Sequence, residues 1–198
     1  GRGSNRSSKT IWRGYQITIT VIDQFLGEMN EVMGKVDEAQ LSQAEALIQK
    51  DKRIFVLGAG RSGLMAKGFA MRLMHIGYTV FAIGETITPS VQAGDVLVAV
   101  SGSGKTASIV ELAEKAKSNG VTVVSVTSNA QSPLGQLGDA TIVVPGATKA
   151  GDGVKSIQLL STLFDQSVHV TLDILCLMLS RRDHVSNDSA AAEHSNME

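Results

Sequence analysis

The 198-residue chain has one cysteine, three prolines and few aromatic side chains. Because Cys176 stands alone, a disulfide framework and a cysteine-rich metal site are excluded, and we expect a reducing compartment, the cytoplasm. The formal net charge of −1 gives no basic excess for binding nucleic acid or an anionic membrane surface. We find no signal peptide and no apolar run of about eighteen residues, so we expect no membrane partner.

The length suits one well-packed domain and is short for two. Residues 1–10 are rich in glycine, serine and arginine, and the opening "GRGS" resembles the remnant of a cleaved expression tag. We therefore expect a single domain over residues 11–198.

The first half of the chain begins with helical patterns. Apolar residues recur at helical spacing from Ile22 to Met33, and a second helix is expected over 37–49. Residues 17–21 alternate as a strand would, but no turn signal separates them from the first helix. We therefore assign them to that helix.

From Arg53 onward, short apolar runs alternate with helical segments. The expected strands are 53–58, 79–83, 96–100, 121–126 and 140–144, and the expected helices are 62–75, 106–118 and 156–180, with a short turn near 132–137. This alternation is typical of βαβ units around a parallel sheet. We predict an α/β, three-layer αβα sandwich with a five-stranded parallel sheet and an N-terminal helical extension. A ligand should lie beyond the carboxyl ends of the strands.

The first candidate ligand loop is Gly58–Gly63, which reads G-x-G-x-x-G between a strand and a helix. With Glu85 placed to bind a ribose hydroxyl, the pattern allows a dinucleotide-binding fold. However, glycines and a helix N-terminus suit any phosphate, and Arg61 and Ser62 add polar donors where such sites favour small residues. Glu85 itself follows a strand in "GETITP", where the alternative is an ordinary solvated carboxylate.

The second candidate loop, "VAVSGSGKT", ends like a nucleoside-triphosphate P-loop but has Ala99 at the first glycine position. No acidic residue ends a neighbouring strand to hold Mg²⁺, which such a site needs. The hydroxyls of Ser101, Ser103 and Thr106 suit a phosphate monoester better. The plainer alternative is that they only cap the following helix.

These loops, with "GAGRSGLMAKGFAMRLMHIG", "GETITP", "SGSGKT" and "KSIQLLSTLFDQ", resemble the 6-phospho-3-hexuloisomerase family of the sugar isomerase (SIS) superfamily. The resemblance covers about Ile22 to the C-terminus, where "EHSNME" is similar to the family's usual ending. It implies the flavodoxin-like SIS fold. It also implies interconversion of D-arabino-3-hexulose 6-phosphate and fructose 6-phosphate through a 2,3-enediol, in the ribulose monophosphate pathway.

The resemblance further implies no metal or organic cofactor, a dimer or tetramer with shared sites, and 3-hexulose-6-phosphate synthase as functional partner. We expect the phosphate to be bound by Ser62, Ser101, Gly102, Ser103, Gly104 and Thr106, and the rest of the substrate by Gly60, Arg61 and Gln158. The preferred general base is Glu85, with Asp165 and His194 as competitors. Asp165 lies on the last long helix, where an exposed carboxylate is the default.

Three departures from the family pattern affect the chemistry. This chain has Gln158-Leu-Leu-Ser161 in place of Gln-Pro-Met-Gly, and Lys105 at a position where relatives carry other polar residues. Asp165 replaces a glutamate, which moves the carboxylate back by about 1.5 Å. The alternatives are therefore a non-catalytic sugar-phosphate-binding SIS module, or another aldose–ketose phosphosugar isomerase.

Overall fold

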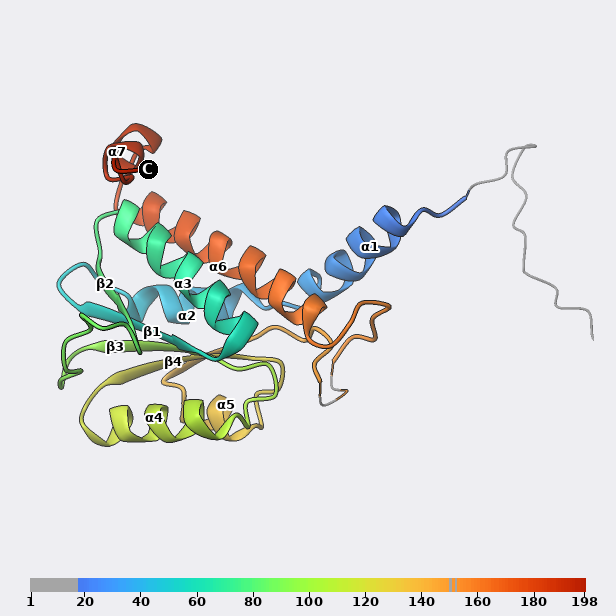
Figure 1. Ribbon diagram of the computed structural model, residues 1–198, viewed down its shortest axis with the longest axis horizontal. Coiled ribbons are helices and arrows are strands. Elements are labelled where there is room, and N and C mark those ends of the chain that lie inside the picture. Colours follow the sequence, from blue (N-terminus) through green and yellow to red (C-terminus); the bar gives the residue numbers. More distant parts are fainter. Residues whose placement is uncertain (1–17, 150, 152) are drawn as a thin grey trace, which may run out of the picture.

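The computed structural model describes residues 18–149, 151 and 153–198. The suggested tag remnant and residue 17 lie outside the described residues. Figure 1 shows a parallel sheet between two layers of helices, with the first helix leaning away from the domain.

The described residues form a five-stranded sheet, as the sequence predicted. Its strands are β1 (Arg53–Gly58), β2 (Thr79–Ala82), β3 (Val96–Val100), β4 (Thr122–Thr127) and β5 (Ala140–Val143). All pairings are parallel, in the order β2-β1-β3-β4-β5. The strands are short apolar runs because helices cover both faces of the sheet.

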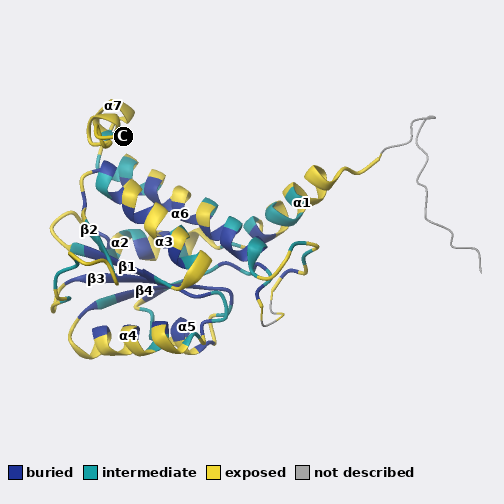
Figure 2. Ribbon diagram, in the orientation of Figure 1, coloured by how far each residue is buried: buried dark blue, intermediate teal, exposed yellow. Residues whose placement is uncertain are grey.

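The helices are α1 (Val21–Met33), α2 (Glu38–Leu47), α3 (Gly60–His75), α4 (Ala107–Ser118), α5 (Pro133–Leu137), α6 (Thr162–Arg182) and α7 (Asn187–Ala192). Helices α2, α3 and α6 cover one face of the sheet, and α4 and α5 cover the other (Figure 1). Figure 2 shows the buried residues concentrated in the strands and on the inner sides of these helices. The predicted three-layer sandwich is confirmed.

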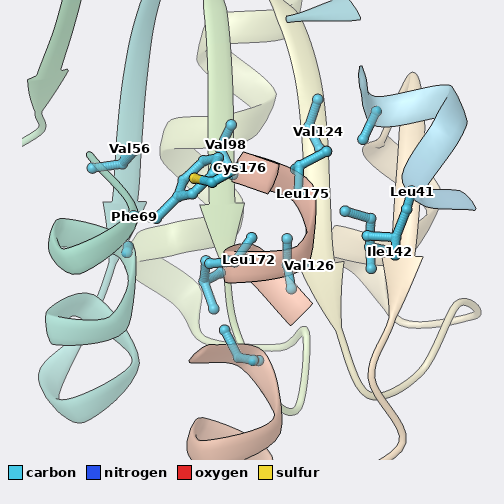
Figure 3. Close-up of a cluster of buried hydrophobic side chains, with 14 of the residues drawn as sticks. Leu41, Val56, Phe69, Val98, Val124, Val126, Ile142, Leu172, Leu175 and Cys176 are labelled. Atoms are coloured by element: carbon cyan, nitrogen blue, oxygen red, sulfur yellow. The ribbon is translucent and has the colours of Figure 1, made fainter. Parts of the chain in front are cut away.

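Helix α6 supplies much of the larger core. By length and composition it could cross a membrane, which the sequence reading had not anticipated, but 56% of its most apolar window is buried within the domain. Figure 3 shows Leu172, Leu175 and Cys176 facing the sheet. Burial raises the pKa of the Cys176 thiol to about 12, so this cysteine is a packing residue. The apolarity of α6 is therefore that of a core helix.

The start of α1 differs from the sequence prediction. Thr20 is the N-cap: its Oγ1 accepts a hydrogen bond from the backbone N–H of Asp23, and the Asp23 carboxylate accepts one from the Thr20 N–H. This reciprocal capping box fixes Val21 as the first residue of the helix. The described residues before it, 18–20, are outside the helix, so the assignment of 17–21 to helix was wrong over them.

The start of α6 was also predicted wrongly, because the helix begins at Thr162 rather than at Ser156. Leu160 has φ of +51°, a left-handed conformation that an α-helix does not contain. The apolar residues that suggested a helix are exposed: Ile157 at 59%, Leu159 at 80% and Leu160 at 70%. The segment 156–161 is instead a turn that leads into the helix. Helix α7 was not anticipated.

The strand order places two loops side by side. In the register of the sheet, Gly58 at the end of β1 is the partner of Val100 at the end of β3. The chain leaves β1 toward β2 on one side and leaves β3 toward β4 on the other, which makes this the topological switch point of the sheet. The two glycine-rich loops found in the sequence therefore meet here.

Close contact between Gly58 and Gly63 brings α3 against the end of β1. A Cβ added at Gly63 would lie 2.7 Å from the carbonyl oxygen of Gly58, and one added at Gly58 would lie 2.8 Å from the Gly63 Cα. No larger residue fits at either position without moving the N-terminus of α3.

This contact predicts that two glycine-to-alanine changes in α3 affect the free energy of unfolding differently. Gly63→Ala should lower the free energy of unfolding by about 1–3 kcal/mol through overpacking. Gly68→Ala, whose added Cβ meets nothing within 4 Å, should leave it unchanged or raise it by up to about 1 kcal/mol. Urea denaturation measures both. Equal changes in the two variants would contradict the close approach of α3 to β1.

Candidate functional site

A pocket of about 540 Å³ lies at the switch point. It is bounded by the loops after β1 and β3, by the loop after β5, and by the first residues of α6 with the turn before them. Its lining residues are Ala59, Gly60, Arg61, Ser62, Val100, Ser101, Gly102, Ser103, Thr106, Thr148, Lys149, Leu159, Leu160, Ser161, Thr162 and Asp165. Its position agrees with the expectation that a ligand lies beyond the strand ends.

The N-termini of α3, α4 and α6 all meet at this pocket. Their N-cap residues, Ala59, Thr106 and Ser161, make no side-chain hydrogen bond to the helices they begin. Each of the other described helices, α1, α2, α5 and α7, has such a side-chain cap. Uncapped first turns leave N–H groups and the positive ends of three helix dipoles directed at one place. The pocket is therefore suited to an anion such as phosphate.

The loop 101–106 keeps its shape through its own hydroxyl groups. Ser101 Oγ accepts a hydrogen bond from the Gly104 N–H at 3.1 Å and lies 2.9 Å from Thr106 Oγ1. Ser103 Oγ accepts one from the Lys105 N–H at 3.1 Å. The Thr106 hydroxyl makes no capping hydrogen bond to α4. The alternative interpretation, in which these hydroxyls only cap the helix, is therefore wrong for this loop.

Gly104 has φ of +68°, and a Cβ there would overlap the hydroxyl of Ser132. It therefore shapes the loop, and it is not among the residues that line the pocket. Five of the six predicted phosphate contacts do line it: Ser62, Ser101, Gly102, Ser103 and Thr106.

The carboxylate in the pocket is that of Asp165. Contrary to the default of an exposed residue, it is 1% exposed, because it lies on the first turns of α6 where the helix enters the domain. Ser62 Oγ donates a hydrogen bond to Asp165 Oδ1 at 2.7 Å, and Arg61 Nε lies 3.5 Å from Oδ2. Burial raises the pKa of Asp165, and the Ser62 hydrogen bond and the charges of Arg61 and Lys149 offset this only in part.

The other two predicted acid–base residues lie elsewhere. Glu85 Oε1 pairs with Lys67 Nζ at 2.8 Å with both side chains about half exposed, and Glu85 does not line the pocket. The His194 ring stacks on His75 with centroids 5.1 Å apart, in a separate pocket beside α7. Among the described residues, only Asp165 of the three candidates shares a pocket with the loops that were predicted to bind phosphate.

Of the predicted substrate contacts, Gly60 and Arg61 line the pocket and Gln158 does not. The Gln158 amide instead donates to Glu28 of α1 at 3.0 Å. Sequence reasoning missed Lys149, which is the second cation of the pocket beside Arg61. Its signal was its place in the glycine-containing loop after β5, since parallel strands bring all their carboxyl ends to one edge of the sheet.

Comparison with known proteins identifies the class. The SIS domain family model matches residues 47–170. The 3-hexulose-6-phosphate isomerase of Mycobacterium gastri is 39% identical over 172 residues, which cover 86% of each chain. That of Bacillus subtilis is 35% identical over 183 residues, covering 91% of this chain and 99% of the relative.

Among solved structures, a protein from Methanococcus jannaschii superposes with a TM-score of 0.76 at 29% identity, covering 89% of this chain and 98% of that one. The function inferred from its crystal structure is 3-hexulose-6-phosphate isomerase.

The chain therefore belongs to the SIS domain family. Within that family it is similar to the 3-hexulose-6-phosphate isomerases over most of its length, which confirms the resemblance seen in the sequence. The dinucleotide and nucleoside-triphosphate interpretations of the two glycine-rich loops are not supported by this membership.

The hydrogen bond between Ser62 and Asp165 predicts a pKa change. Because that bond lowers the pKa of Asp165 against the effect of burial, Ser62→Ala should raise this pKa further. A carboxyl-carbon NMR titration measures it. Ser103→Ala is the matched control, since Ser103 lines the same pocket and bonds to Lys105 instead. An unchanged pKa in Ser62→Ala, or an equal rise in both variants, would contradict the assignment.

Proposed function

We propose that this protein interconverts D-arabino-3-hexulose 6-phosphate and fructose 6-phosphate. The observation that carries the proposal is a buried carboxylate with a raised pKa, Asp165, in the same pocket as three uncapped helix N-termini. The first feature suits proton transfer and the second suits a phosphate. The isomerase names of the relatives support the same reaction.

The proposed mechanism begins with the phosphate at the loop 101–106. The ionised carboxylate of Asp165 takes the proton from C2 of the 3-hexulose, and a 2,3-enediol forms. The proton of the C2 hydroxyl passes to the oxygen on C3, Asp165 returns its proton to C3, and the carbonyl is thereby moved to C2. Arg61 and Lys149 both line the pocket, and their positive charges would stabilise the negative charge that develops on the enediol oxygen. Because burial raises the pKa of Asp165, its ionised form is a stronger base than an exposed carboxylate.

We assign the base to Asp165 rather than to Glu85, because Glu85 is already paired with Lys67 and lies outside the pocket lining. Because His194 lies in a separate pocket of its own chain, it could contact a bound substrate only if it came from a second subunit. We also propose a homo-oligomer, a dimer or tetramer. In support, Val21, Ile22 and Leu26 of α1 are between 59% and 71% exposed.

The reaction sets the proposed cellular context. The 3-hexulose phosphate would be supplied by 3-hexulose-6-phosphate synthase within the ribulose monophosphate pathway. The single buried thiol supports a cytoplasmic location.

Asp165→Asn should abolish proton exchange while leaving sugar-phosphate binding in place, because the amide cannot accept a proton. Proton NMR of fructose 6-phosphate in D₂O measures exchange at C3, and calorimetry measures binding. Glu85→Gln is the comparison and should retain turnover. Exchange confined to C1 in the wild type would indicate an aldose–ketose isomerase. Binding without any exchange would indicate a sugar-phosphate-binding module.

The same carboxylate should reduce folding stability. Its pKa is higher in the folded protein than in the unfolded chain, so stability falls as the pH rises from the unfolded pKa of about 3.9 through the folded pKa, and stays lower above it. Asp165→Asn should therefore unfold at a higher urea concentration than wild type at pH 7. This difference should shrink below about pH 3, where the wild-type carboxyl is neutral in both states. If Asp165→Asn were more stable than the wild type by the same amount at every pH, the assignment of the effect to the Asp165 carboxylate would be wrong.

A further inference from the structure

Helix α1 is outside the part of the chain that matches the SIS family, residues 47–170. It leans away from the domain beside the start of α6 (Figure 1), and only Val32 among its residues is buried. Its size and exposure alone would suggest that it takes no part in the site. One of its side chains, Glu28, contradicts that impression.

The Glu28 carboxylate is surrounded by donors from the segment 156–158. Its Oε2 accepts hydrogen bonds from Ser156 Oγ at 2.6 Å and from the Gln158 side-chain amide at 3.0 Å. Its Oε1 accepts one from the Ile157 backbone N–H at 2.6 Å. Ser156 Oγ in turn accepts from the Gln158 N–H at 2.9 Å. Both oxygens are used, and three consecutive residues are held by one side chain.

The held segment continues directly into the wall of the pocket. Leu159, Leu160 and Ser161 line the pocket, and Ser161 precedes the turn of α6 that carries Asp165. The wall is tied on its other side to α6: the Leu159 carbonyl accepts hydrogen bonds from the N–H and hydroxyl of Thr162, and the Ser161 carbonyl accepts one from the Asp165 N–H. Its apolar side chains contribute little to holding it. Leu159 and Leu160 are largely exposed, and Leu160 has a left-handed backbone that costs about 1–3 kcal/mol and persists only where neighbouring contacts determine it.

We propose that Glu28 is a positioning residue of the pocket: it fixes the turn 156–158 and thereby the wall 159–161 against the sugar phosphate. The N-terminal helix is then part of the functional site, although it lies outside the family match. For its kinetic consequence the proposal rests on the proposed function, but its structural consequence and its effect on binding do not.

The charge state of Glu28 fits this role. Partial burial opposes ionisation, but the hydrogen bonds from Ser156, Ile157 and Gln158 outweigh it, so the pKa of Glu28 lies below its usual value. The carboxylate is thus ionised at neutral pH. Charge-assisted hydrogen bonds are the stronger kind.

The test compares Glu28→Gln with Glu31→Gln on the same helix, where Glu31 makes only an exposed ion pair with Lys35. A glutamine offers one acceptor oxygen in place of two, so it cannot satisfy the three donors. In Glu28→Gln, the Ile157 amide should exchange its hydrogen about tenfold faster in the absence of ligand. The Kd and KM for fructose 6-phosphate should rise about tenfold, which corresponds to about 1.4 kcal/mol. The kcat should stay within about twofold. Glu31→Gln should change none of these.

Ser156→Ala removes one hydrogen bond of the same network without changing α1. It therefore tests the network even if Glu28→Gln disturbs the folding of the helix. The double variant should lose less affinity than the sum of the two single variants, because each removes part of one shared network. Unchanged Ile157 exchange and unchanged affinity in Glu28→Gln would overturn the proposal, as would strictly additive losses. If the wild type binds fructose 6-phosphate without turning it over, the proposed function fails, while the exchange and calorimetry results still decide the role of Glu28.

Discussion

Three helices begin at the carboxyl edge of the sheet without side-chain caps. The site depends on them, because it costs free energy to bury backbone N–H groups that have no hydrogen-bond acceptor. Ala59, Thr106 and Ser161 are the N-caps involved, and none bonds its own helix through a side chain. Unpaired N–H groups are expensive when buried, so they must face water or an anion. The strand order β2-β1-β3-β4-β5 brings two of these helices to the switch point, and α6 closes the pocket from the side.

Asp165 is the carboxylate that this pocket buries. It is a nearly fully buried carboxylate whose pKa is raised by burial and only partly lowered by Ser62 and Arg61. Such a residue weakens the fold when ionised and is retained where its chemistry is needed. The proposed isomerisation would need such a group, because it begins with removal of a proton from C2. Asp165 lies on the first turn of α6, directly after the segment that leads into this helix.

The N-terminal helix α1 makes hydrogen bonds to the segment that precedes α6. Glu28 and the segment 156–158 join the helix that leans away from the domain to the turn that begins α6. The residues that follow this segment, Leu159 and Leu160, are largely exposed, and the left-handed backbone of Leu160 keeps them outside the helix.

The sequence alone was enough to predict the sheet, the place of both glycine-rich loops and five residues that line the pocket. These depend on local patterns: apolar runs, glycine spacing, and hydroxyls placed just before a helix. Only the tertiary structure decided which carboxylate shares the pocket with those loops, that Lys149 joins them, and that Gln158 turns toward Glu28. Ser62 and Asp165 are 103 positions apart, and Glu28 and Ser156 are 128 apart. Whether such side chains meet depends on how elements pack across the fold, and no periodicity within a single helix or strand records that.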